Sequence, residues 1–142
     1  MLEYKVDGMV ISNTTVSRPD SLKSEFKTEK GGLSGEPLRE KSTETIREMY
    51  RLTKGQVPII GVGGISSGAD AYEKIKAGAS VVEVYSSLVF NGMGLVPKIK
   101  KELVELLKKD GYRNIADAVG KDVDVFCVCF RTSDWNKQHG FN

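Results

Sequence analysis

Three short runs of mainly apolar residues, rich in β-branched side chains, punctuate the chain. They lie at residues 8–12, 57–62 and 80–85, and glycine, asparagine or serine bounds them. Runs of this length and composition are typical of β-strands. Because the runs are almost continuously apolar, they favour a parallel sheet that is buried on both faces.

Apolar residues at helical spacing lie between and after these runs. The pattern predicts helices at residues 38–53, 68–77 and 95–109, with a last short helix at about 115–119. Glycines follow the first three as stop signals: Gly55, Gly78 and Gly111. Asn114 is the expected cap of the last helix.

The alternation of strands and helices predicts a parallel α/β fold. The three units are too few to close a (β/α)8 barrel, which takes about 250 residues, or to make a comfortable doubly wound sheet. Two segments do not follow the alternation. Residues 13–36 form a long polar connection, and loops of such length in compact domains are often functional. Residues 121–142 lack helix caps and a following element, and we interpret them as an atypical tail that is not necessarily ordered.

Composition removes several classes of function. Of 142 residues, 39% are hydrophobic and 28% charged, which indicates a globular domain, and a net charge of +2 gives no basic footprint for nucleic acid. No apolar run approaches the roughly 18 residues of a membrane span, and no signal peptide follows Met1. The single histidine, His139, excludes a Ser-His-Asp triad. With Cys127 and Cys129 it makes a poor metal site, so we expect no metal.

The glycine-rich segment Gly61 to Gly68 is the strongest chemical signal. It follows a predicted strand and opens a predicted helix. Glycines let a backbone approach a ligand closely, and the first amides of a helix attract anions. A tight turn that needs glycine for its geometry alone is an equally good interpretation, so phosphate binding stays an even alternative here.

Three weaker candidates follow the predicted strands or precede a helix. Gly31 to Gly35 could bind phosphate through Ser34, or serve only as a hinge. Ser12 to Thr15 ends the first strand, where parallel α/β folds carry their sites. Its asparagine suits a ligand with carboxylate and imide groups, although a local turn is the simpler interpretation. Tyr85 to Ser87 ends the third strand, and Tyr85 alone could simply be core.

Together, four segments match one pattern in order and spacing: Asp7 to Pro19, Gly31 to Leu38, Val57 to Gly68 and Ala77 to Tyr85. With the helical segment Ser42 to Tyr50, they resemble the last three strands of class 2 dihydroorotate dehydrogenases, the quinone-dependent, mitochondrial-type enzymes. The resemblance covers about residues 6–120. It implies three βα units of an incomplete (β/α)8 barrel in residues 1–120.

The resemblance also implies an activity. The family oxidises dihydroorotate to orotate in pyrimidine biosynthesis, using FMN and passing electrons to ubiquinone. Asn13 and Thr14 would bind orotate, and Gly63 and Gly64 would offer amides to the FMN phosphate. The full set of expected flavin-binding residues is Ser12, Ser34, Gly35, Val62, Gly63, Gly64, Tyr85 and Ser86. Ser12 and Ser86 stand where the family commonly has threonine.

Other parts of the family's machinery have no counterpart in this chain. The serine base, the groups that hold the flavin ring, the quinone-binding helices and the mitochondrial targeting segment would all lie upstream. We therefore expect no catalytic residue here, and inner-membrane association only through that upstream part. Two alternatives stay open: a non-catalytic short product that binds at most phosphate or a partner, and another FMN- or phosphate-binding barrel enzyme.

Overall fold

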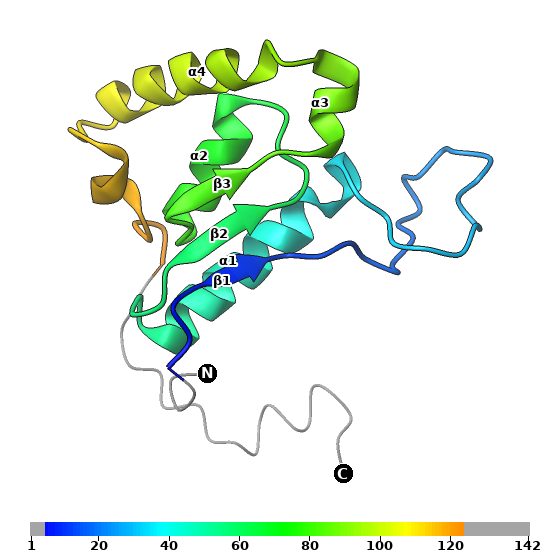
Figure 1. Ribbon diagram of the computed structural model, residues 1–142, viewed down its shortest axis with the longest axis horizontal. Coiled ribbons are helices and arrows are strands. Elements are labelled where there is room, and N and C mark those ends of the chain that lie inside the picture. Colours follow the sequence, from blue (N-terminus) through cyan, green and yellow to red (C-terminus); the bar gives the residue numbers. More distant parts are fainter. Residues whose placement is uncertain (1–4, 124–142) are drawn as a thin grey trace.

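The structure, a computed structural model, describes residues 5–123. Three parallel strands form one sheet in the order β1 (Met9–Ile11), β2 (Ile59–Val62) and β3 (Val81–Glu83). In the register of this sheet, Ile11 is paired with Gly61, and Gly61 with Val82. The predicted strands and their parallel arrangement are thus confirmed (Figure 1).

Helices follow the strands, and most of them lie where the sequence predicts. They are η1 (Glu36–Leu38), α1 (Arg39–Thr53), α2 (Gly68–Lys76), α3 (Ser86–Asn91), α4 (Leu95–Lys109) and η2 (Ile115–Ala118). The last of these is a 3-10 turn rather than an α-helix, but its expected cap is confirmed, because the Asp117 amide donates to Asn114 Oδ1 at 3.2 Å. Helix α3 is absent from the sequence-based prediction. None of the helices described is both long and apolar enough to cross a membrane.

Two hydrophobic clusters hold the helices against the sheet. Ile46 of α1 and Ile59 of β2 are completely buried in the first cluster, which joins α1 to the strands. Ile75 of α2 is buried in the second, together with Ile99 and Leu103 from the apolar stripe of α4. Burying a side chain of this size stabilises the fold by roughly 1.5–3 kcal/mol. The two clusters therefore fix the positions of α1, α2 and α4 relative to the strand ends.

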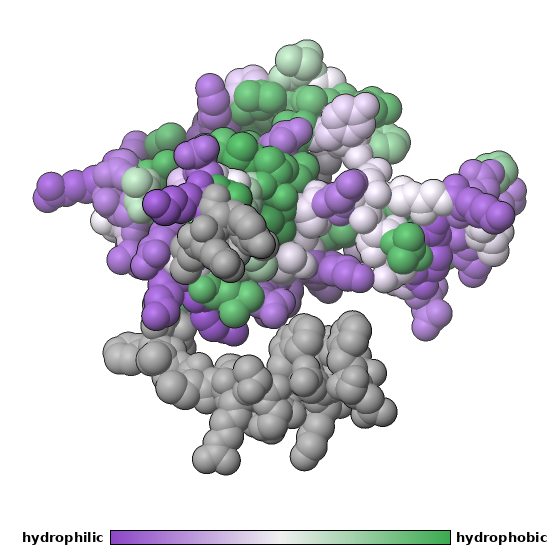
Figure 2. All heavy atoms as spheres, turned by 60° about the horizontal axis from the view of Figure 1, so that its bottom comes forward, coloured by the Kyte–Doolittle hydropathy of each residue, from purple (hydrophilic) through white to green (hydrophobic). Residues whose placement is uncertain are grey.

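The opposite face of the sheet is open in the part of the chain that the structure describes. Val10, Ile60 and Val81 point from the three strands to this face and are 61%, 38% and 58% exposed. The expectation of a sheet buried on both faces is therefore wrong for these residues. Connections between parallel strands are right-handed. Because the strands lie in the sheet in sequence order, each connection places its helix on the same face, and the other face is left without a helix. Figure 1 shows α1 and α2 on the covered face, and Figure 2 shows hydrophobic residues gathered in the middle of the turned view.

The expected tail at residues 121–142 falls almost wholly on residues outside the described part. This includes the apolar run at 125–130, Cys127, Cys129 and His139. The division at residue 120 therefore stays a prediction.

Candidate functional site

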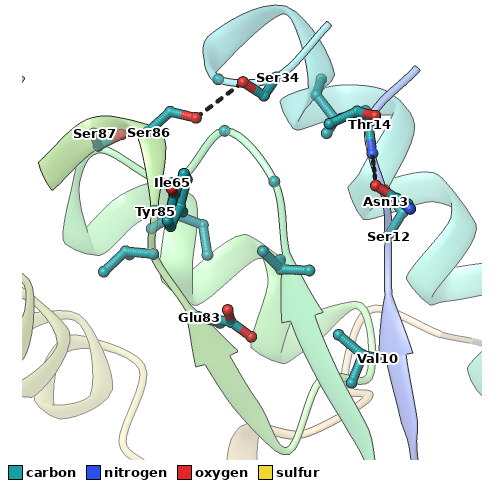
Figure 3. Close-up of a pocket in the computed structure, with 16 residues that line it drawn as sticks. Val10, Ser12, Asn13, Thr14, Ser34, Ile65, Glu83, Tyr85, Ser86 and Ser87 are labelled. Atoms are coloured by element: carbon teal, nitrogen blue, oxygen red, sulfur yellow. Dashed lines mark hydrogen bonds between the residues drawn. The ribbon is translucent and has the colours of Figure 1, made fainter. Parts of the chain in front are cut away.

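A pocket of about 430 Å³ lies at the carboxyl ends of the three strands. Every residue that the resemblance assigns to a ligand lines it: Ser12, Asn13, Thr14, Ser34, Gly35, Val62, Gly63, Gly64, Tyr85 and Ser86. These residues come from the ends of β1, β2 and β3 and from the end of the loop before η1 (Figure 3). The structure thus brings four separate stretches of sequence to one cavity.

Ile65 and Ser87, from two of the candidate segments, also line the pocket. Four further lining residues were not anticipated: Val10, Leu38, Glu83 and Val84. Val10 and Glu83 lie on the open face of the sheet, so the two-residue period of a strand could have identified them once that face was known. Figure 3 shows these two below the strand ends, whereas Ser34, Ser86 and Ser87 lie above them. The carboxylate and the hydroxyl groups therefore occupy different ends of the pocket.

At the end of β1, Asn13 makes a local contact. The Thr14 amide donates to Asn13 Oδ1 at 2.7 Å (Figure 3). This bond reaches the next residue and not the one after it, so it is not the bond of an Asx turn. The Nδ2 group of Asn13 is the donor that the side chain can offer to a ligand in the pocket.

The loop of residues 13–36 is folded back onto the pocket by a short antiparallel bridge. Thr15 and Leu33 exchange two backbone hydrogen bonds, of 3.0 and 2.7 Å. A methyl group at Gly32 would come within 1.8 Å of Thr14 Oγ1, so only glycine allows this close approach. The bridge places Ser34 beside the strand ends although it is far from them in sequence.

Arg18 organises the outer part of the same loop. Its guanidinium donates to the carbonyl oxygens of Lys27 at 2.9 Å, Glu29 at 3.0 Å and Gly31 at 2.8 Å. It also reaches the carbonyls of Thr15 and Ser17. One side chain therefore holds together a loop that contributes few buried residues.

The glycine turn after β2 is tightly packed on the start of α1. Gly63 and Gly64 have φ angles of +121° and +71°, a region that favours glycine. A methyl group at Gly64 would lie 2.6 Å from the Cβ atom of Arg39. Packing alone thus accounts for the glycines. Within residues 5–123, the amides of Gly63, Gly64 and Ile65 donate to no protein acceptor, which leaves them as donors for a ligand.

The first amides of α2 already have protein partners. The Gly68 amide donates to Glu102 Oε2 at 2.6 Å, and the Asp70 amide donates to Ser67 Oγ at 3.2 Å. The expectation that this helix start faces an anion is therefore not supported, because carboxylate and hydroxyl groups occupy it. Burial alone would raise the pKa of Asp70, but hydrogen bonds from Ser66 and Ser67 and the nearby Arg39 charge outweigh it and lower the pKa.

No group of three or more potential metal ligands occurs among the described residues. The ligand donors around the pocket are instead hydroxyl groups and main-chain amides. Ser34 and Ser86 approach each other from opposite sides of it, with 3.1 Å between their Oγ atoms (Figure 3). Hydroxyls and amides of this kind suit a phosphate or another oxygen-rich anion.

The fold and the pocket define a parallel α/β unit whose ligand site lies at the carboxyl ends of its strands, as in barrel enzymes. A family model described as dihydroorotate dehydrogenase matches residues 1–107. The chain belongs to the dihydroorotate dehydrogenase family, which is a family of oxidoreductases. The expected resemblance is confirmed.

Individual relatives agree with this assignment. A dihydroorotate dehydrogenase (quinone) of Azorhizobium caulinodans is 59% identical over 122 residues, covering 86% of this chain and 34% of the relative. The mitochondrial enzyme of Mus musculus is 57% identical over 120 residues, covering 84% of this chain and 30% of the relative. A ligand-free dihydroorotate dehydrogenase structure from Eimeria tenella superimposes with a TM-score of 0.83 at 50% identity, covering 85% of this chain and 33% of that one.

The chain thus spans about a third of the length of the relatives it matches. The predicted partial barrel is confirmed by the match to a dihydroorotate dehydrogenase structure. The relatives include bacterial and mitochondrial proteins, so the comparisons fix no cellular compartment for this chain.

Proposed function

We propose that this chain supplies the phosphate-binding side and part of the orotate-binding side of an FMN-dependent dihydroorotate dehydrogenase of the quinone type. The observation that carries the proposal is the convergence of all the resemblance-derived ligand residues on one strand-end pocket. Family membership supports the reaction class, and the relatives' names supply the quinone acceptor.

The donor set of the pocket fits a flavin phosphate. The unpartnered amides of Gly63 and Gly64 lie on one wall, and Tyr85 and Ser86 lie on another. Ser34 faces Ser86 across the gap. Phosphate oxygens accept several hydrogen bonds at once, and a rim of amides and hydroxyls can satisfy them without a nearby carboxylate.

The end of β1 fits the substrate. Asn13 Nδ2 and the Thr14 hydroxyl line the pocket and can orient the oxygens of orotate. Ser12 precedes Asn13 and joins the end of β1 to the glycine turn, since its amide donates to the Val62 carbonyl at 3.1 Å. These residues would hold the substrate, and FMN, when bound, would supply the hydride acceptor. Orientation of this kind reduces the entropic part of the reaction barrier.

Proton removal from the substrate belongs to a base that we assign to no residue of this chain. A general base must lie within hydrogen-bond reach of the proton it takes. The resemblance gives this role to a serine in a segment that precedes residue 6, along with the quinone site and the association with the mitochondrial inner membrane. The dihydroorotate-to-ubiquinone reaction is therefore proposed for a protein that contains both segments.

Titration of the purified chain with FMN tests the proposal. We expect saturable quenching of flavin fluorescence, and we expect orotate to perturb the bound-flavin spectrum. Dihydroorotate-dependent reduction of a quinone-coupled dye is expected to be absent. FMN binding that is lost in neither the Gly64→Ala variant nor the Ser86→Ala variant would contradict the assignment of the pocket. Dye reduction by the chain alone would contradict the assignment of the base.

The open face of the sheet favours a second candidate, a non-catalytic product. Val10, Ile60 and Val81 expose apolar surface that a closed barrel would cover. A chain with this surface is expected to associate or to unfold easily. A monodisperse monomer with one sharp thermal transition would count against that expectation. Analytical ultracentrifugation measures the association, and calorimetry measures the thermal transition.

A further inference from the structure

Lys74 of α2 is a completely buried lysine behind the glycine turn. Its side chain has no exposed surface, and its Nζ donates to the Arg39 carbonyl at 3.2 Å, Ser42 Oγ at 3.1 Å and Thr43 Oγ1 at 2.9 Å. Among the described residues no carboxylate lies within ion-pair distance of this Nζ. A buried charge without a paired charge is costly, so its presence calls for an explanation.

The position of Lys74 relative to α1 makes the charge more unusual. Its three acceptors all belong to the first residues of α1, which begins at Arg39. The amino-terminal end of a helix carries partial positive charge and disfavours a cation. Helix α1 therefore gives no electrostatic reason for a lysine at this point. Asp70 and Glu73 of α2 raise the pKa of Lys74 and so supply part of the compensating charge, while Arg39 opposes them. An anion near the glycine turn would supply more.

A chain of hydrogen bonds joins Lys74 to the pocket. Ser42 accepts from Lys74 Nζ and donates its own hydroxyl proton to the carbonyl oxygen of Val62. That carbonyl shares a peptide unit with the amide of Gly63, and the two groups of a trans peptide point in opposite directions. The Gly63 amide thus points away from Ser42, and Gly63 lines the pocket.

Hydrogen bonds in such a chain polarise one another. A donor on the Val62 carbonyl draws electron density from the peptide unit, which makes the Gly63 N–H a stronger donor. The Ser12 amide donates to the same carbonyl, at 3.1 Å, so the peptide plane is held from two sides. One hydroxyl group and one peptide unit separate the buried ammonium group from a ligand at Gly63.

We propose that Lys74, acting through Ser42, positions and polarises the Val62–Gly63 peptide for binding a phosphate monoester. Lys74 and Ser42 are positioning residues in this scheme, since neither lines the pocket. The inference rests on the proposed function, because it takes the FMN phosphate as the anion. Burial lowers the pKa of Lys74 to about 8, so the ammonium form still predominates at neutral pH.

Three variants separate this role from a purely structural one. Ser42→Ala breaks the chain between Lys74 and Val62, and Lys74→Met removes the cation. Thr43→Val is the matched control, because it removes a contact of Lys74 at 2.9 Å that does not lead to the glycine turn. Each variant is titrated with FMN and with riboflavin, which has the same ring but no phosphate.

The ratio of the two dissociation constants is the decisive quantity. We expect the wild-type chain to prefer FMN, and we expect Ser42→Ala and Lys74→Met each to lower that preference about tenfold, as for the loss of one charge-assisted hydrogen bond. Riboflavin affinity and the preference of Thr43→Val are expected to stay unchanged. Equal weakening of both ligands, or an unchanged preference in Ser42→Ala and Lys74→Met, would overturn the inference and leave the proposed function standing. A wild-type chain with no preference for FMN would overturn both.

A measurement without ligand gives an independent check. Polarisation of the peptide moves the Gly63 amide proton downfield in the NMR spectrum. We expect this resonance to move upfield in Ser42→Ala and Lys74→Met but not in Thr43→Val. If all three variants shift it equally, the effect is a general loosening of α1, and the proposed chain of hydrogen bonds is wrong.

Discussion

The two segments that meet at the pocket are built in opposite ways. The glycine turn at residues 61–68 is packed against α1, and Gly64 has no room for a methyl group beside Arg39. The loop at residues 13–36 projects from the body of the molecule, and most of its residues are exposed (Figure 1). Arg18 and the bridge between Thr15 and Leu33, rather than a hydrophobic core, fix its conformation.

This difference separates two tasks within one site. A turn that is packed on a hydrophobic core keeps its amides at fixed positions, which suits recognition of a phosphate of constant shape. A loop held by polar contacts can open at little cost, because few buried groups are disturbed. The loop carries Asn13, Thr14 and Ser34, so its opening would change the access to the pocket.

Replacing a glycine in the packed turn is expected to have the largest effect. Gly64→Ala forces a methyl group into Arg39 at a φ of +71° and should destabilise the fold by about 3 kcal/mol. The matched change in the loop is Gly31→Ala. Gly31 has a φ of +138° but no atom within 4 Å of the new methyl group, so a loss of about 1 kcal/mol is expected. Urea denaturation followed by circular dichroism measures both, and equal losses would contradict the distinction.

The pH dependence of stability should also originate on the packed side. Burial is the main cause that lowers the pKa of Lys74 from 10.5 to about 8, while Asp70 and Glu73 raise it and Arg39 lowers it. The unfolded chain thus binds more protons than the folded chain between these two values. The free energy of unfolding therefore rises with pH from about 8 to about 10.5, by an amount on the order of 2–3 kcal/mol.

The control for this effect is the Lys74→Met variant, in which the rise should disappear. Denaturation at a series of pH values gives the slope for both proteins. A wild-type curve that falls over the same interval would show that the lysine is stabilised, not penalised, by its surroundings.

Much of the site could be read from sequence because parallel strands bring their carboxyl ends to one edge. Ser12, Val62 and Tyr85 each lie at or just after the end of a strand, so finding the strands was enough to bring them together. Ser34 was a candidate from its own segment, but its place in the same pocket required the family resemblance, because the bridge that brings it there is a pairing across a long loop. Periodicity also gave the full extent of α4, whose apolar stripe is unbroken.

Other features depend on contacts that no local pattern encodes. Helix α3 has only six residues and no side-chain cap, so its sequence carries little helical signal. Lys74 is an ordinary helical lysine in sequence, and only the hydroxyl groups of α1 reveal that it is buried. The sequence also did not reveal the open face of the sheet. The strands are apolar on both faces, and this pattern does not tell whether the residues that cover a face belong to this chain.

The loop provides the next prediction. Arg18→Ala removes the donor that holds five carbonyls and should speed amide hydrogen exchange across residues 13–36 by about tenfold or more, with a global loss under about 1 kcal/mol. Arg18→Lys keeps the charge but loses the fork of donors, so it should protect the loop only partly. Unchanged exchange in Arg18→Ala would mean that the Thr15–Leu33 bridge alone orders the loop. A large global loss would mean that the loop belongs to the core.

The smallest expected effect lies where the two segments face each other across the pocket. Ser34 is exposed and Ser86 is half-buried, and their 3.1 Å contact is open to water. A double-mutant cycle with Ser34→Ala and Ser86→Ala should give a coupling energy for stability under about 0.5 kcal/mol, because water replaces the lost partner. Both hydroxyls nevertheless line the pocket, so FMN affinity is expected to fall in each single variant, and more in Ser86→Ala, whose position follows β3 directly. Coupling of stability well above this value would show that the contact fastens the loop to the body, and the loop would then be less free to open than its exposure indicates.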